Sequence, residues 1–95
     1  RAEALLGGRI VRYTSRPLSY NRDDDIAEYR SRLTVEAVLR RTVNGEVLWK
    51  GQASWEEDYP AANDKVLQND LEQAAIAVIS ERVADELFAR MLADF

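Results

Sequence analysis

Two runs of consecutive acidic residues are the clusters in this 95-residue sequence whose side chains could support acid–base or metal chemistry. Residues 23–25 are three aspartates, but they lack the alternating spacing and the glycine of a calcium-binding loop, which favours a solvated loop. Residues 56–58 are Glu-Glu-Asp and fall in a predicted strand, where the first and third would face arginines. A small hydrolase that uses Glu57 or Asp58 is therefore only the third-ranked hypothesis, because it needs a carboxyl with a raised pKa in a cleft.

The composition excludes most other catalytic groups. The sequence has no histidine and no cysteine, so it offers no imidazole base, thiol nucleophile, disulfide or Cys/His metal site. No serine lies in a Gly-x-Ser-x-Gly turn, and Gly7-Gly8 lacks the Lys-Ser/Thr of a phosphate-binding loop. The residues therefore predict a protein that is not an enzyme and that uses no cofactor or metal.

Arginine is the residue type with binding chemistry that remains, because its guanidinium group matches the geometry of phosphate. Residues 1–50 carry ten Lys and Arg against seven Asp and Glu, whereas residues 51–95 carry three against ten. The simplest interpretation is a solvated, charged sheet face; the functional one is a site for anionic groups. A net charge of −4 without a basic stripe predicts no nucleic-acid partner. The candidate anion-binding residues are Arg16 and Arg22 in a loop, and Arg40, Arg41 and Lys50 near a hairpin tip.

The elements that would position these residues are predicted from apolar periodicity. Residues 4–14 have the β-branched and aromatic content of a strand, and residues 15–25 have the composition of a loop. Residues 29–43 and 46–59 place apolar side chains at odd positions, which is typical of half-buried antiparallel strands.

Asn44-Gly45 lies between the last two strands and is a strong hairpin signal. A two-residue turn would set the apolar positions of one strand beside the polar positions of the other. We therefore predict a three-residue loop over 43–45, a type I turn followed by a bulge, with Gly45 in the left-handed conformation. The predicted cross-strand pairs are Thr42–Glu46, Leu39–Trp49, Ala37–Gly51, Val35–Ala53, Leu33–Trp55, Arg32–Glu56, Arg30–Asp58 and Tyr29–Tyr59.

A long helix is predicted over residues 66–92, which contain neither Gly nor Pro and are rich in Ala, Leu, Glu and Arg. Its start is open between Asp64 as the N-cap and a capping box formed by Asn69 and Glu72. Its apolar stripe would pack on the odd face of the hairpin, so both tryptophans of that face are predicted to be core.

The predicted fold is α+β: a two-layer sandwich, with an antiparallel or mixed sheet of about three strands and a long C-terminal helix packed on one face. Residues 1–95 would form a single domain. One helix would leave part of the apolar sheet face bare, so another helix or strand is expected upstream, or from a second chain in a homo-oligomer or swapped dimer. The sequence opens without methionine, which fits a processed chain or a fragment.

Several features follow one another in a fixed order along the chain. They are a strand with Leu6, Gly8 and Ile10, a loop with Ser15, Pro17 and Tyr20, a strand that opens at Tyr29, the turn Asn-Gly-Glu-Val-Leu-Trp at 44–49, a strand that ends on Tyr59, and an amphipathic C-terminal helix. This order resembles the LPS-assembly lipoprotein family LptE, also called RlpB. The resemblance covers nearly the whole chain and rests on the spacing of all its parts together.

The resemblance implies a non-catalytic function. LptE proteins are outer-membrane lipoproteins of Gram-negative bacteria that face the periplasm, plug the β-barrel LptD, assist its assembly and bind lipopolysaccharide (LPS) on its way to the cell surface. It also implies that one strand, one helix and a lipidated cysteine precede this region, so the chain would be the C-terminal part of an LptE-like domain, attached to the membrane through an N-terminal lipid. The expected partners are an LptD-type barrel and LPS, whose phosphates the five basic residues would contact. The alternative is a periplasmic lipoprotein module that regulates a cell-wall enzyme through protein contacts.

Overall fold

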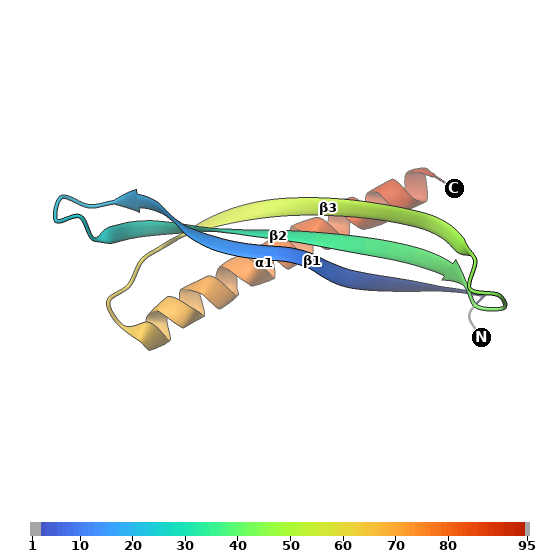
Figure 1. Cartoon of the computed structure of the whole chain (residues 1–95), viewed down its shortest axis with the longest axis horizontal. Coiled ribbons are helices and arrows are strands. Elements are labelled where there is room, and N and C mark those ends of the chain that lie inside the picture. Colours follow the sequence, from blue (N-terminus) through green and yellow to red (C-terminus); the bar gives the residue numbers. More distant parts are fainter. Residues whose placement is uncertain (1–2, 95) are drawn as a thin grey trace.

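A three-stranded antiparallel sheet with one helix lying across it forms the chain in the computed structural model, which describes residues 3–94 (Figure 1). The elements are β1 (Ala4–Tyr20), β2 (Ile26–Arg41), β3 (Val47–Pro60) and α1 (Lys65–Ala93). The sheet order is β1-β2-β3, and both neighbouring pairs are antiparallel. The predicted α+β class, three strands and C-terminal helix are confirmed, and the sheet is antiparallel rather than mixed.

The predicted register between β2 and β3 is observed over most of its length. Every predicted pair from Tyr29–Tyr59 to Leu39–Trp49 is present. This register sets the apolar side chains of both strands on the same face, because side chains alternate between faces with a period of two. The hydrophobic pattern thus determined the pairing, as expected.

The turn itself differs from the prediction. The Arg41 N–H donates to the Glu46 carbonyl at 2.8 Å, so Arg41 rather than Thr42 faces Glu46, and the loop has four residues, 42–45. The register shifts between Leu39 and Arg40, which leaves Leu48 as the extra residue. The bulge that restores the apolar register therefore lies inside β3, next to the turn rather than within it.

Gly45 has the predicted left-handed backbone, with φ of 72°. A Cβ added there would meet no atom within 4 Å, so a substitution would be disfavoured by backbone conformation alone. We expect Gly45→Ala to lower the free energy of unfolding by about 1 kcal/mol, measured by urea denaturation. Gly7→Ala is the control, because Gly7 also has open space around it but lacks the positive φ. Equal stability of the two variants would contradict this prediction.

Asp64 is the N-cap of α1, and its side chain accepts a hydrogen bond from the Val66 N–H at 2.9 Å. This N-cap resolves the alternative left open by the sequence. The helix packs mainly on β3 and less on β2. The core lies between these layers, and its buried members are Leu33, Ala37, Trp49, Ala53, Ile79, Val83 and Leu87.

Trp55 departs from the predicted core. Its side chain shares the helix-facing side with Trp49, but it is 42% exposed, whereas Trp49 is 8% exposed. Trp55 lies on the edge strand β3. Arg82 of α1 lies over its ring, with the guanidinium carbon 6.0 Å from the ring centroid. A cation–π contact thus covers only part of this ring.

The helix-facing side of β1 is largely uncovered. Leu6 and Ile10 are 52% and 65% exposed, although they pair with core-facing positions of β2. Together with Leu87 and Phe88 of α1 they line a mainly apolar groove of about 610 Å³. The bare apolar face predicted from the sequence is therefore present, and what covers it stays a prediction.

Candidate functional site

The sheet face opposite α1, here called the outer face, carries most of the charged side chains of the strands. A register shift in β1 between Ile10 and Arg12 leaves Val11 as an extra residue. Because of this bulge, Arg12, Thr14 and Arg16 all lie on the outer face, paired with even-numbered residues of β2. β1 also continues to Tyr20, so Arg16 lies in a strand rather than in the predicted loop.

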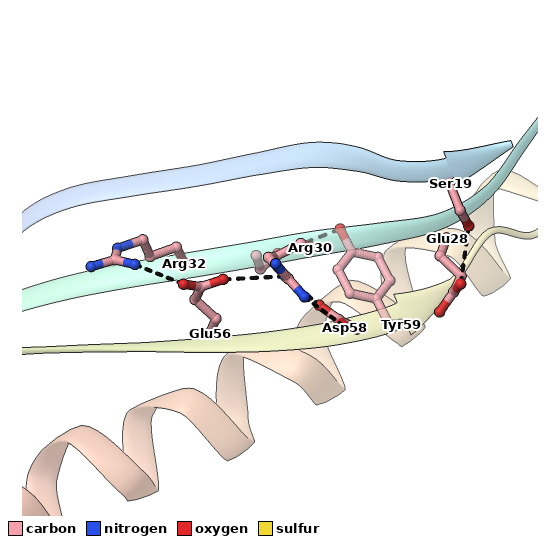
Figure 2. A network of polar contacts seen from close by, with 8 residues as sticks. Ser19, Glu28, Arg30, Arg32, Glu56, Asp58 and Tyr59 are labelled. Atoms are coloured by element: carbon pink, nitrogen blue, oxygen red, sulfur yellow. Dashed lines mark hydrogen bonds and ion pairs between the residues drawn. The ribbon is translucent and has the colours of Figure 1, made fainter.

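A row of ion pairs joins β2 to β3 on the outer face (Figure 2). The Arg30 guanidinium donates to both carboxylate oxygens of Asp58, at 2.7 and 3.1 Å, and its Nε also lies 3.2 Å from Glu56. The Arg32 guanidinium donates to Glu56 at 2.7 Å. Both predicted charge pairs are therefore present, and one carboxylate serves two arginines.

The hydrogen bond from Arg30 lowers the pKa of Asp58 from its ordinary value of 3.8. A carboxyl whose pKa is lower when folded adds stability above its unfolded pKa, and this contribution is lost as the pH falls through the folded pKa. As the pH falls from about 5 to below the folded pKa of Asp58, the parent should therefore lose more stability than Asp58→Asn, by a small amount because the pair is exposed. Acid titration of the unfolding free energy measures this difference. An equal loss of unfolding free energy in the parent and in Asp58→Asn over this pH range would contradict the prediction.

The lowered pKa of Asp58 also bears on the hydrolase hypothesis, which needs a carboxyl with a raised pKa. The pKa of Asp58 moves in the opposite direction, so this group is held ionised instead of being prepared as an acid. Glu57 lies opposite Ser31 on the helix-facing side and is half-buried. Within residues 3–94, no group of three or more acidic side chains is placed to hold a metal ion.

A polar network fills the helix-facing side near the start of α1. The Tyr13 hydroxyl donates to Glu72 at 2.5 Å and lies 2.8 Å from the fully buried Ser31 hydroxyl, while Ser15 and Tyr59 are joined at 2.8 Å. Burial and the hydrogen bond to Glu72 raise the pKa of Tyr13. The network supplies partners for buried hydroxyls and ties β1 to the helix, which is a structural role.

The five basic residues selected from the sequence form two separate groups. Arg16 and Arg22 lie toward the end with the 21–25 loop, and Arg40, Arg41 and Lys50 lie toward the hairpin at the opposite end (Figure 1). The Cα extents of the molecule are 59 × 23 × 17 Å, so the two groups cannot act on one phosphate.

The two groups also differ in their contacts. Arg40 donates to the Gly45 carbonyl at 3.1 Å, Arg41 donates to Glu46 at 3.4 Å, and Lys50 lies 3.6 Å from Glu36. The contact of Lys50 with Glu36 was not predicted. Among the described residues, neither Arg16 nor Arg22 has a hydrogen bond or ion pair through its side chain.

The outer face also contains a polar hollow of about 780 Å³. Arg12 and Arg16 line it from β1, and Thr34 and Ser54, joined by a hydroxyl hydrogen bond of 2.7 Å, line it from β2 and β3. Sequence reasoning placed Arg12 in the basic half of the chain but did not select it. The two adjacent apolar residues Ile10 and Val11, which break the alternation, were the available signal for the bulge that orients Arg12.

Comparison with known families decides the identity of the chain. The family model LptE, described as lipopolysaccharide-assembly, matches residues 1–91. The chain belongs to the LptE family. The match spans all three strands and most of α1, and it confirms the family inferred from the order of the elements. No curated protein matches the chain.

Membership assigns this LptE-family protein to LPS assembly, and the α+β fold agrees with the one that the resemblance implied. In the described part of the chain, no helix combines the length and apolarity that crossing a bilayer requires.

Proposed function

We propose that this protein is a non-catalytic outer-membrane lipoprotein that binds and plugs an LptD-type β-barrel and contacts LPS on its way to the cell surface. The observation that carries the proposal is the family match over residues 1–91. The elongated shape supports it, because a rod with a Cα cross-section of 23 × 17 Å is narrow enough to enter a wide barrel.

In this proposal the protein faces the periplasm and is attached to the outer membrane by a lipid near the N-terminus of the full-length protein. Its partners are the barrel and LPS. Family membership in LPS assembly supports both assignments.

The five basic residues are the proposed contacts with LPS phosphates, because arginine forks bind phosphate with paired hydrogen bonds. Arg16 and Arg22 are favoured, since their side chains have no competing partner among the described residues. Arg40, Arg41 and Lys50 would first have to release the carbonyl and carboxylates that they now contact.

Depletion of the protein in its native host tests the proposed function. We expect less LPS at the cell surface, measured by labelling intact cells with a reagent that cannot cross the outer membrane, and recovery when the parent gene is restored. Normal surface LPS would contradict the proposal. Normal surface LPS together with altered cell-wall crosslinking would instead support regulation of a cell-wall enzyme.

A further inference from the structure

Positive and negative charges on the outer face are unequally distributed among the three strands. Around the hollow, β1 presents Arg12 and Arg16, and β2 presents Arg30 and Arg32. The carboxylates of β3 form ion pairs with the β2 arginines alone. Among residues 3–94, no side chain forms a hydrogen bond or ion pair with the guanidinium groups of Arg12 and Arg16.

Arg16 is an exposed side chain whose positive charge is not balanced by any described carboxylate. Arg16 lies directly opposite Arg30 in the β1–β2 ladder, and like charges at opposed positions destabilise a sheet. Arg30 is already neutralised by Asp58 and Glu56. Arg16 has no such partner, so an anion bound on the β1 side would provide the counter-charge that it lacks.

The hollow has the size and the lining of a site for a phosphorylated sugar. Its volume of about 780 Å³ falls within the range of roughly 300–1,000 Å³ that is usual for small-ligand pockets. Thr14, Thr34, Gln52 and Ser54 add hydroxyl and amide groups that can both donate to and accept from sugar hydroxyls. The apolar residues Val11, Pro17 and Leu18 also line the hollow, and so does the carboxylate of Glu56, which is paired with Arg30 and Arg32 and so lies on the side away from β1.

The spacing of the two free arginines suits a ligand with more than one phosphate. They are four residues apart on the same face of one strand, which places their Cα atoms roughly 13 Å apart, with Thr14 between them. An acidic peptide is a poorer match, because peptides that add to sheets pair with an edge strand, whereas this hollow extends over the paired middle of the sheet.

We infer that the hollow is a binding site for a phosphorylated saccharide headgroup, with Arg12 and Arg16 each holding an anionic group. The inference rests on the proposed function, which makes the headgroup of LPS the ligand. It adds Arg12 to the residues selected from the sequence and places Arg16 in a defined pocket.

Binding of purified LPS to the full-length protein tests the inference. The double variant Arg12→Gln/Arg16→Gln is compared with the parent and with a control, Arg9→Gln/Arg82→Gln, which loses the same charge at positions that do not line the hollow. The probes are LPS and the same LPS after enzymatic removal of its phosphates. We expect the double variant to bind phosphorylated LPS at least about tenfold more weakly than the control does. With dephosphorylated LPS the two variants should bind equally.

Each alternative outcome overturns the inference in a recognisable way. If the double variant and the control bind LPS equally weakly compared with the parent, the loss is a non-specific effect of charge. A difference that persists with dephosphorylated LPS would show that the arginines do not recognise phosphate. Inorganic phosphate that binds as tightly as LPS would make free phosphate the ligand. If the parent does not bind LPS, both the inferred site and the proposed contact with LPS are rejected. If the parent binds LPS and the double variant binds it equally well, only the inferred site is rejected.

Discussion

Replacing Ile79 with alanine should lower the free energy of unfolding by about 2–5 kcal/mol. The side chain is fully buried and lies in the core cluster between α1 and the sheet. The close-packed residues around Ile79 relax only partly when its side chain is shortened, so the lost contacts are not recovered and a cavity remains. This loss would be a large fraction of the roughly 5–15 kcal/mol that stabilises a typical domain.

Urea denaturation followed by circular dichroism measures this effect. Val78→Ala is the matched control, because Val78 precedes Ile79 on the helix but is 39% exposed. We expect the control to cost less than about 1 kcal/mol. A cost at Val78 as large as at Ile79 would mean that α1 does not pack on the sheet in the orientation described here.

Gly51→Ala should destabilise the protein by about 1–3 kcal/mol, because the added methyl group overpacks the core. An ideal Cβ at this position would lie 2.5 Å from Cη2 and 2.6 Å from Cζ2 of the Trp49 ring. The ring cannot easily move, since it is buried and its indole N–H donates to Asp94 at 2.6 Å. Glycine is therefore needed here for space and not for an unusual backbone angle.

A double-mutant cycle with Trp49→Leu isolates this contact. Leucine removes the ring that covers Gly51, so adding Gly51→Ala in that background should cost less than about 0.5 kcal/mol. Thermal and urea denaturation of the four proteins provide the cycle. An undiminished cost in the Trp49→Leu background would place the clash somewhere other than at the indole.

The long-range pairing of the sheet was predictable because one physical rule dominates it. A slip of one residue would move every apolar side chain of a strand to the wrong face, so the apolar pattern excludes every odd slip. The short connection at Asn44-Gly45 then favours the register that pairs Leu39 with Trp49 and Leu33 with Trp55. The position of the bulge was not predictable, since an extra residue in the turn or at Leu48 restores the same register.

Burial was less predictable than the register. Alternation places Trp55 on the helix-facing side, but it does not say how far a helix extends over an edge strand. The exposure of Trp55 depends on the path of α1 across the sheet, which follows from packing between Ile79, Val83 and the core residues of β2 and β3.

The candidate site was only partly predictable for a similar reason. Charge alone selected Arg16, but the bulge at Val11 decides that Arg12 shares its face. The sequence also does not show which carboxylate neutralises which arginine. Asp58 and Glu56 reach only the arginines of β2, and this three-dimensional limit leaves Arg12 and Arg16 unpaired among the described residues.

Co-purification tests the proposed role in LPS transport most directly. The full-length protein, tagged in its native host, would be purified from detergent-solubilised envelopes, and its partners would be identified and quantified by mass spectrometry. We expect an LptD-type outer-membrane β-barrel in an equimolar complex. Recovery of a cell-wall enzyme instead, or of no envelope partner, would contradict the proposed role as a barrel plug, although the fold and the family membership would stand.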